Sequence, residues 1–456
     1  MRARAGAAIL PDDALLALHE RSADRYPVLL ESMGSESTLG RYDVLLARPG
    51  ERLTRLPDGR LSGPTLHDTP PGRFLDALDE WWHAEGASVA LRGDAPFTGG
   101  WFLYLGYELA DEIEPALQLR PPHGPRAVAW RMHAAVVRDR STGQVSFHAD
   151  DGEAASLRRQ VLEDLENLPP ASDPVAAPRA MRVEEEPAEI FLEGVEAALD
   201  AIGRGDVYQV NLSRSWRAEL PPGVRAADLY RRLRAANPAP FAGIAQLPGL
   251  AVLSSSPERL LRIDGGVAST RPIAGTRPRG ATTAADASLR DELRLNEKER
   301  AEHVMLVDLE RNDLGRICKG GSVRVDEFMT IETYATVHHI VSNVRGDLRP
   351  DVTPGQAIAA VFPGGTITGC PKVRCMQLLA EFEAQPREAY TGSMGYLGLD
   401  GSLDLNILIR TLTVADGRIE FRTGAGIVAD SQPAAELAET RAKAQGLLRA
   451  LGPHSC

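Results

Sequence analysis

The chain has 456 residues, 43% of them hydrophobic and 25% charged, a composition typical of a globular protein with a large core. Lys and Arg number 51 against 63 Asp and Glu, and the net charge of −12 argues against a surface for nucleic acid or anionic membrane. Four cysteines are too few for a disulfide framework, and no stretch approaches the ~20 apolar residues of a membrane helix. We therefore expect a soluble protein with reduced thiols, located in the cytoplasm.

Two regions with a connection between them are predicted along the chain. Residues 1–168 contain mixed signals, among them a helical pattern at 74–82 and a glycine-bounded apolar run at 99–107 that is typical of a strand. Residues 169–187 hold five prolines and a run of three glutamates, which indicates an exposed linker. Residues 188–451 are rich in short strands, a pattern that favours an α+β fold over regular βαβ alternation. Strands are expected there at 207–213, 250–255, 338–345, 391–397, 405–414 and 419–422, and helices at 190–202, 291–310, 357–361, 373–383 and 433–451.

Two of the predicted helices each place acidic residues on one face. Glu299 and Glu302 lie three residues apart in the first, and Glu436, Glu439 and Lys443 follow the spacing i, i+3, i+7 in the second. Such spacing most often marks a solvated helix face. Two such faces opposed across a cleft would instead suit Mg²⁺, which takes oxygen ligands and often shares an oxyanion of its substrate.

Two glycine-containing turns could approach an anion closely. The segment 362–374 contains three glycines and Thr366 where a strand leads into a helix, and backbone N–H groups at a helix start favour an anion. A turn that only caps the helix explains this segment equally well. The turn Gly424-Ala425-Gly426 is shorter, and a carboxylate could also reach its backbone.

Three single residues are candidates for binding or catalysis. His339 lies in an apolar strand and could point into a site, although most such histidines are structural. Arg410 follows an apolar strand, which suggests a guanidinium held for a carboxylate. Tyr390 could donate a hydrogen bond to the same anion.

Together these segments resemble the chorismate-utilising enzymes, a family that includes anthranilate synthase, aminodeoxychorismate synthase and isochorismate synthase. The resemblance runs from about Ala188 to Lys443, and a weaker one covers residues 10–150. One block could match by chance, but so many in the same order could hardly do so. The blocks are Ser-Pro-Glu258, Arg-Pro-Ile-Ala-Gly-Thr276, Glu299-Arg-Ala-Glu302-His303, Val307-Asp-Leu-Glu-Arg-Asn-Asp313, His339-Ile-Val-Ser342, Gly-Gly-Thr366, Tyr390, Arg410, Gly-Ala-Gly426 and Glu436-x-x-Glu439-x-x-x-Lys443.

The resemblance implies an α+β fold with two packed, antiparallel-rich β-sheets surrounded by helices, and an active site in the cleft between the sheets. Residues 1–168 would form an N-terminal region like that of anthranilate synthase component I, residues 169–187 a linker, and residues 188–451 the chorismate-binding catalytic region.

The resemblance also implies roles for individual residues. Mg²⁺ is expected among four glutamates, where it would bridge to the ring carboxylate of chorismate. Glu258 is the expected general acid or base, Thr276 lies in a catalytic block, and His339 and Thr366 would help the C4 oxygen leave. The expected metal ligands are Glu299, Glu302, Glu436 and Glu439, and the expected substrate-binding residues are Tyr390, Arg410, Gly424, Ala425, Gly426 and Lys443.

Position 274 bears on which product is formed. Many aminodeoxychorismate synthases hold a lysine there that attacks the substrate ring, whereas Ala274 closes that covalent route. Direct attack by ammonia at C2, as in anthranilate synthase, is then favoured. Residues 206–213, 363–372 and 390–396 nevertheless resemble the aminodeoxychorismate synthase branch more closely. Both products stay open, and the resemblance leans toward aminodeoxychorismate.

The resemblance further implies a partner and a possible effector. The chain has no Gly-x-Cys-x-Gly elbow of a glutaminase, so a separate glutamine amidotransferase subunit is expected to supply ammonia. Leu30, Glu31 and Ser32, together with Asn237, Pro238 and Phe241, resemble a tryptophan pocket, although a simple packing site is equally consistent. A non-catalytic tryptophan sensor is the competing class of function, and the acidic residues argue against it.

Overall fold

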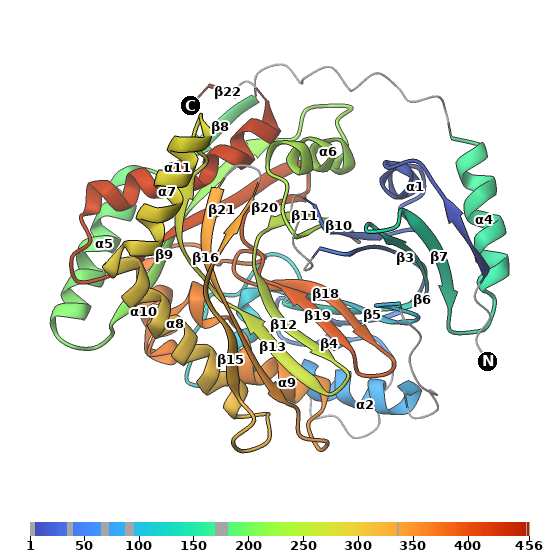
Figure 1. Cartoon of the computed structure of the whole chain (residues 1–456), viewed down its shortest axis with the longest axis horizontal. Helices are drawn as coiled ribbons and strands as arrows, with labels where there is room; N and C mark the ends of the chain where they lie inside the picture. Colours follow the sequence, from blue (N-terminus) through green and yellow to red (C-terminus); the bar gives the residue numbers. More distant parts are fainter. Residues whose placement is uncertain are drawn as a thin grey trace.

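The structure is a computed structural model that describes residues 5–33, 40–64, 73–86, 95–168, 181–334, 337–452 and 454–455. Its helices lie around layers of β-strands (Figure 1). Within the described ranges, none of these helices combines the length and apolarity needed to cross a bilayer. The helices are α1 (Ala14–Arg21), α2 (Phe74–Gly86), α3 (Ala110–Ile113), α4 (Ala154–Glu166), α5 (Ala188–Gly203), α6 (Ala226–Ala236), α7 (Thr283–Leu295), α8 (Glu297–Gly315), α9 (Pro354–Val361), α10 (Lys372–Phe382) and α11 (Pro433–Leu451), with 3₁₀ turns η1 (Tyr107–Leu109) and η2 (Gly365–Ile367).

The strands alternate with these helices along the chain without forming regular βαβ units. They are β1 (Ala5–Ile9), β2 (Val28–Glu31), β3 (Tyr42–Arg55), β4 (Leu61–Ser62), β5 (Gly100–Leu105), β6 (Ala127–Asp139), β7 (Gln144–Ala149), β8 (Met181–Glu185), β9 (Gln209–Glu219), β10 (Phe241–Leu247), β11 (Leu250–Ser256), β12 (Arg259–Asp264), β13 (Val267–Arg271), β14 (Ile273–Pro278), β15 (Arg324–Thr333), β16 (Val337–Asp347), β17 (Gly369–Cys370), β18 (Ser393–Gly398), β19 (Leu403–Asn406), β20 (Thr411–Ala415), β21 (Arg418–Ile427) and β22 (His454–Ser455).

Strand pairing extends in two arms from the long strand β6. One arm runs from β6 through β3, β2, β10, β11, β20, β21 and β9 to β8. The other runs from β6 through β5, β18, β19, β12 and β13 to β16, which β14 and β15 also flank. These pairings are antiparallel, and β8 pairs with β22 in parallel. The candidate site residues lie mainly near the far ends of the two arms.

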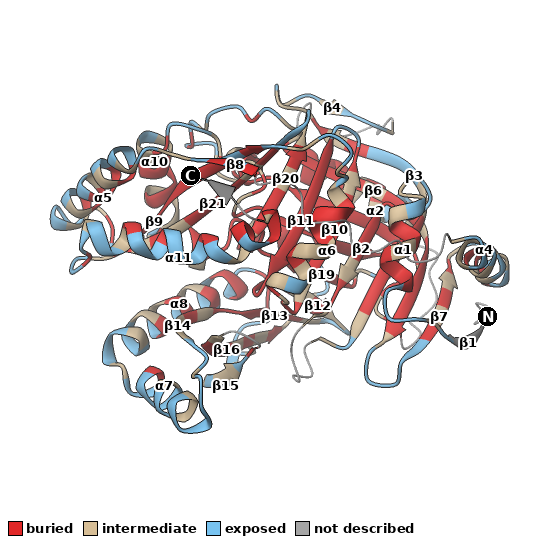
Figure 2. Ribbon diagram, turned by 90° about the horizontal axis from the view of Figure 1, so that it is seen from above, coloured by how far each residue is buried: buried red, intermediate tan, exposed pale blue. Residues whose placement is uncertain are grey.

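The two arms pack face to face around a shared apolar core. Successive side chains of a strand point to opposite faces, so Leu45 of β3 faces an outer core with helices while Val44 and Leu46 face the inner one. Phe102 of β5 and Val252 of β11 meet in that inner core, although they belong to different arms. Figure 2 shows the strands buried and the outward faces of α5, α7 and α11 exposed. The expected α+β fold with packed antiparallel layers and outer helices is confirmed.

The N-terminal and C-terminal regions share both arms. Strand β2 pairs with β10, and β5 pairs with β18, so strands from residues 1–168 stand between strands from residues 188–451. Residues 169–180 of the expected linker lie outside the described residues. The rest of that linker is not simply an exposed connection, because β8 pairs with β9 there.

Two predicted elements are each divided in the structure. The helix predicted at 291–310 is two helices, α7 and α8, because Asn296 leaves helical geometry and its side chain accepts a hydrogen bond from the backbone N–H of Glu299. The strand predicted at 405–414 is interrupted between β19 and β20, where Arg410 has a φ of 51°. Both interruptions lie at the candidate site.

Candidate active site

Glu258 is a buried carboxyl between β11 and β12. Its exposed fraction is 5%, and burial raises its pKa to about 7, against the opposing effects of the Thr366 hydroxyl and Arg410. The Thr366 hydroxyl is a neighbour without hydrogen-bond geometry, since neither its Oγ1 nor Oε1 of Glu258 has a hydrogen-bond partner among the described residues. A carboxyl with this pKa can hold a proton at neutral pH and deliver it in a reaction.

His339 of β16 faces Thr276 of β14, as the register of the two strands dictates. The His339 Nδ1 lies 2.9 Å from Oγ1 of Thr276 and 3.4 Å from the carbonyl oxygen of Gly275. Only a protonated Nδ1 can bond to that carbonyl, which leaves Nε2 as an acceptor, and Nε2 has no partner among the described residues. Burial, with a smaller contribution from Arg410, lowers the pKa of His339 to about 3. The imidazole is therefore a neutral hydrogen-bonding group rather than a cation.

Arg410 is a donor within electrostatic reach of Glu258, and the Tyr390 hydroxyl is a donor beside Gly424. Within the described ranges, the structure gives the Arg410 guanidinium no hydrogen bond or ion pair, and its left-handed backbone marks the break between β19 and β20. Burial lowers the pKa of Arg410, and the charge of Glu258 opposes that change. Burial raises the pKa of Tyr390 to about 12, so its phenol stays protonated and can donate.

The glycines of β21 leave room for these groups. A Cβ added to Gly424 would lie 2.6 Å from the Tyr390 hydroxyl and 2.7 Å from the carbonyl oxygen of Leu212. A Cβ at Gly426 would collide with the Gln209 side chain. Ala425, between the two glycines, packs into an apolar core instead. The two glycines therefore allow Tyr390 and Gln209 to lie against the backbone of this strand.

The four predicted metal-binding glutamates come from α8 and α11. Burial raises the pKa of Glu302, and the neighbouring charges of Glu299 and Glu439 raise it further. Burial likewise raises the pKa of Glu436, again with Glu439 contributing. The carboxylates thus lie within electrostatic reach of one another across the gap between the two helices.

These glutamates do not form a closed ligand set, because each has a protein partner. Glu299 accepts from Arg277 at 3.1 Å, Glu302 accepts from Gln209 at 3.0 Å, and Glu439 pairs with Lys443 at 2.7 Å. The Ser431 side chain lowers the pKa of Glu436 as a hydrogen-bond donor. In the described part of the chain, no group of three or more His, Cys, Asp or Glu residues could hold a metal ion as it stands.

Lys443 has an exposed side chain with two partners in the protein. Its Nζ donates to the carbonyl oxygen of Gly424 at 3.0 Å and pairs with Glu439. It connects the glycine strand to the acidic residues.

Sequence reasoning assigned no role to two polar residues that line this site. Gln209 donates to Glu302, and Asn211 Nδ2 donates to the carbonyl oxygen of Thr366 at 3.1 Å. They alternate along β9, so both side chains lie on one face of the strand. The available signal was the alternation of polar residues with Val210 and Leu212 at the start of β9.

Four of the six residues of the expected tryptophan pocket line a cavity of about 610 Å³: Leu30, Glu31, Ser32 and Phe241. Glu31 is engaged there by Arg234 at 2.7 Å and by the Tyr230 hydroxyl at 2.6 Å. The other two, Asn237 and Pro238, are not among its lining residues, and Asn237 instead exchanges hydrogen bonds with Ser255.

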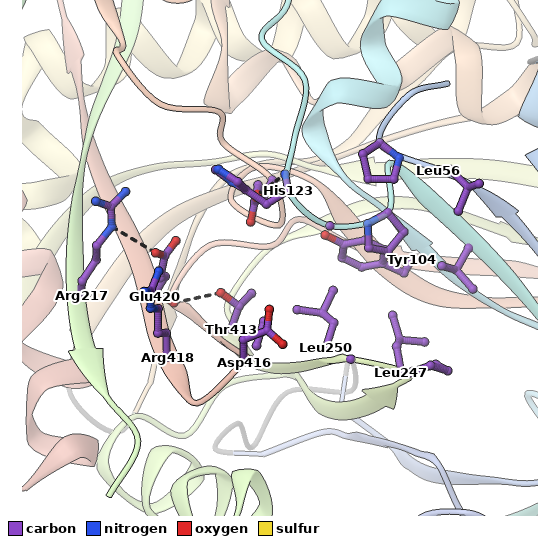
Figure 3. A pocket seen from close by; sticks show the side chains of 18 of the residues that line it. Leu56, Tyr104, His123, Arg217, Leu247, Leu250, Thr413, Asp416, Arg418 and Glu420 are labelled. Carbon is purple, nitrogen blue, oxygen red and sulfur yellow. Dashed lines mark hydrogen bonds and ion pairs between the residues drawn. The ribbon is translucent and has the colours of Figure 1, made fainter. Parts of the chain in front are cut away.

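A different cavity, of about 1220 Å³, lies between β3, β9 and the β20–β21 turn (Figure 3). None of the predicted site residues is among the described residues that line it. Charges of both signs alternate on its wall, with Arg217 and Glu420 paired at 3.0 Å. The cavity does not belong to the catalytic set.

The fold is one of antiparallel layers with outer helices, and it holds the buried acid Glu258 within electrostatic reach of the Arg410 guanidinium. The chain belongs to the chorismate binding enzyme family, whose sequence model matches residues 65–449.

Three known proteins are similar to the chain over most of its length. It is 40% identical to the anthranilate synthase component I-like protein of Synechocystis over 91% of this chain and 83% of that protein. It is 44% identical to aminodeoxychorismate synthase component 1 of Bacillus subtilis over 78% and 77% of the two chains. The crystal structure of anthranilate synthase component I from Streptococcus pneumoniae superposes with a TM-score of 0.81 at 31% identity, covering 91% of this chain and 93% of that one. The relatives therefore include enzymes that form either product.

Proposed function

We propose that the chain aminates chorismate with ammonia to give 4-amino-4-deoxychorismate, the precursor of 4-aminobenzoate in folate biosynthesis. The observation that supports chorismate as the substrate is the position of Arg410 near the buried acid Glu258. The Arg410 guanidinium has no hydrogen bond or ion pair within the described ranges. The similarity to the Bacillus subtilis aminodeoxychorismate synthase supports the product.

The residues of the cleft suit the two carboxylates of chorismate. Arg410 and Tyr390 supply side-chain donors, and the missing Cβ of Gly424 lets the tyrosine hydroxyl lie against β21. Lys443 adds positive charge at the same edge of β21.

Glu258 would act as the general acid at the C4 oxygen. As ammonia forms a C–N bond at C2, the C4–O bond breaks, and the departing oxygen takes the Glu258 proton and leaves as water. The new amine releases one proton, so the step is balanced in protons. A second ammonia then attacks C4 as the C2–N bond breaks. The C2 amine takes up a proton and leaves as ammonia, and the new C4 amine releases one proton, so this step is also balanced. Because Ala274 is a methyl side chain, ammonia itself takes the place of a lysine nucleophile.

Mg²⁺ is the proposed cofactor, held by Glu299, Glu302, Glu436 and Glu439. The donor set fits a hard divalent cation, because these carboxylates raise one another's pKa and a cation between them would relieve that repulsion. When bound, the ion would polarise the ring carboxylate of the substrate. Arg277, Gln209 and Lys443 would then release the carboxylates that they now hold.

Ammonia is proposed to come from a separate glutamine amidotransferase subunit, as the component names of the relatives suggest. We expect weak synthesis with ammonium salts alone and much better glutamine-dependent synthesis once that partner is added. Equal use of glutamine by the isolated chain would contradict this part of the proposal.

Product analysis tests the reaction. The chain is incubated with chorismate, Mg²⁺ and ammonium, with a parallel sample containing EDTA. Aminodeoxychorismate forms without pyruvate and gives 4-aminobenzoate after a lyase is added, whereas anthranilate is fluorescent and appears with pyruvate. Anthranilate synthesis is the second candidate, favoured by Ala274 and by the similarity to the Streptococcus pneumoniae enzyme. A mixture that yields neither product would support a non-catalytic binder.

A further inference from the structure

Arg277 is a partly buried cation that contacts one of the proposed metal ligands. Its Nη1 donates to Oε1 of Glu299 at 3.1 Å and to the carbonyl oxygen of Thr276 at 2.9 Å. Its Nε donates to Oε1 of Glu292 at 2.8 Å. One arginine of β14 thus holds a carboxylate from α7 and a carboxylate from α8 at the same time.

The Glu299 carboxylate lies directly on the backbone of β14. A Cβ added to Gly275 would come within 3.0 Å of Oε2 of Glu299, so the missing side chain makes room for the carboxylate. Helices α7 and α8 both pack against β14, and Figure 2 shows the three elements together. Glu299 is also in the first turn of α8, where a helix N-terminus favours negative charge. Arg277 therefore contacts a carboxylate whose position the fold already fixes.

Arg277 differs from the partners of the other proposed metal ligands. Glu302 is held by Gln209, which is uncharged, and Glu439 is held by Lys443 of the same helix. Among the partners that the described residues provide for these ligands, only Arg277 also holds a carboxylate from outside the set. It is a cation with two alternative anionic partners.

The second partner lowers the cost of releasing the first. If Glu299 turns to a metal ion, Arg277 keeps its hydrogen bonds to Glu292 and to its own strand. No charge is then left buried and unpaired, which is the main cost of breaking such a pair. The Glu292 side chain is 58% exposed, whereas that of Glu299 is 22% exposed. Arg277 thus has an inner partner in the site and an outer partner at the surface.

We propose that Arg277 is a competitor built into the metal site, which holds Glu299 until a divalent cation displaces it and is then retained by Glu292. The inference rests on the proposed function, in which Glu299 is a ligand of Mg²⁺. The arginine balances the negative charge that the clustered glutamates place on one another. Only molecules in which Glu299 is released can bind the ion through the full set, so the pair with Arg277 lowers the apparent affinity by that fraction.

The Arg277→Gln substitution tests the competition, because glutamine keeps a polar side chain but carries no charge. Mg²⁺ is titrated by calorimetry into the full chain without substrate, and again with chorismate present and ammonium absent. We expect the affinity to rise up to about fivefold, since a partly exposed ion pair contributes at most about that factor. Arg279→Gln is the matched control, because it removes the same charge two residues away from a pair with Asp286 at 2.7 Å. It should change the affinity by less than about twofold, because screening weakens distant charges.

A second pair of variants tests the outer partner. Glu292→Gln removes the carboxylate that retains Arg277, so the arginine is left to Glu299 and the affinity for Mg²⁺ should fall about threefold. Asp291→Asn is its control, because it removes an exposed charge from the neighbouring position of α7, where the only ion pair is a long one of 3.8 Å to Arg294. Equal losses of affinity in the two variants would contradict the retention of Arg277 by Glu292.

The outcomes separate this inference from the proposed function. If the unmodified chain binds no Mg²⁺ in either titration, the cofactor of the proposed function is wrong, and the competition is wrong as well. If the chain binds Mg²⁺ and Arg277→Gln leaves the affinity unchanged, the competition alone is wrong. A weaker affinity in that variant also overturns it, because Arg277 would then position Glu299 as a ligand. If Arg277→Gln does not fold, the comparison of Glu292→Gln with Asp291→Asn decides.

Discussion

Arg387 and Glu383 form a buried, two-point ion pair beside Tyr390. The Arg387 Nε donates to Oε2 of Glu383 at 2.8 Å, and Nη2 donates to Oε1 at 2.7 Å. The same guanidinium donates to the carbonyl oxygen of Asn211 at 2.7 Å and lies 5.5 Å from the centre of the Tyr390 ring. One side chain thus joins strand β9 to the tyrosine that is proposed to bind substrate.

Replacing Arg387 by lysine should disturb both stability and substrate binding. Lysine cannot donate to both Glu383 oxygens and to β9 at once, and disrupting a buried pair costs about 3–5 kcal/mol when one partner is lost. We expect a lower melting temperature by calorimetry and a KM for chorismate raised about tenfold, with a smaller effect on kcat. Arg25→Lys, at an exposed two-point pair with Asp164, should change neither quantity appreciably. An unchanged KM in Arg387→Lys would mean that Tyr390 does not depend on this pair.

Glu258→Gln should remove the acid without changing the shape of the site. We expect kcat to fall by roughly 10²–10⁴-fold, the usual contribution of a general acid. The pKa of Glu258 is about 7, and the protonated form is the active one, so kcat of the unmodified chain should decline as pH rises above 7. The residual activity of the variant should lack that decline. A variant that keeps the same alkaline limb in its pH profile would show that another group titrates.

Gly424→Ala should weaken chorismate binding and also strain the pairing of β21 with β9, because the added Cβ would lie 2.7 Å from the carbonyl oxygen of Leu212. The added Cβ would come within 2.6 Å of the Tyr390 hydroxyl, so the tyrosine must move from the carboxylate site. Steady-state kinetics should show a KM raised about tenfold or more, since a lost hydrogen bond to a charged group is worth about 1.5–3 kcal/mol. Gly203→Ala is the matched control, because a Cβ there meets no atom within 4 Å. Equal KM values for the two variants would contradict the placement of the substrate carboxylate.

Glu108 should make stability depend on pH. Its carboxylate accepts from the backbone N–H groups of Arg387 and Glu388, and burial raises its pKa to about 7 from an ordinary 4.5. The folded state therefore binds more protons than the unfolded state between these values, and stability contributed by this group falls as pH rises from about 4.5 through 7. Denaturant titrations at pH 5 and pH 8 measure this change as the free energy of unfolding. That free energy should decrease between the two pH values by about 2 kcal/mol more in the unmodified chain than in Glu108→Gln. Glu153→Gln, at an exposed carboxylate, should keep the full decrease.

The sequence predicted the fold class, and the structure brings the predicted site residues Glu258, Thr366 and Arg410 close to one another. Where the structure differs from the sequence-based prediction, the reasons are local. Asn296 divides a helix that hydrophobic periodicity alone treats as continuous, because its capping hydrogen bond to Glu299 outweighs helix propensity. The left-handed backbone of Arg410 cannot be predicted from the residue type, because arginine has no preference for that conformation. The Arg387 side chain also donates to carbonyl oxygens of β9 and η2, and sequence order does not reveal these contacts with distant segments.

The pairing of β2 with β10 and of β5 with β18 has a consequence for any shortened form of this protein. A polypeptide limited to residues 188–451 would keep every group of the proposed catalytic machinery yet lose the neighbours of two central strands. Bare strand edges of that kind attract other chains. Such a fragment should accumulate as aggregates instead of a smaller enzyme, so the first third of the polypeptide is part of the catalytic unit's architecture.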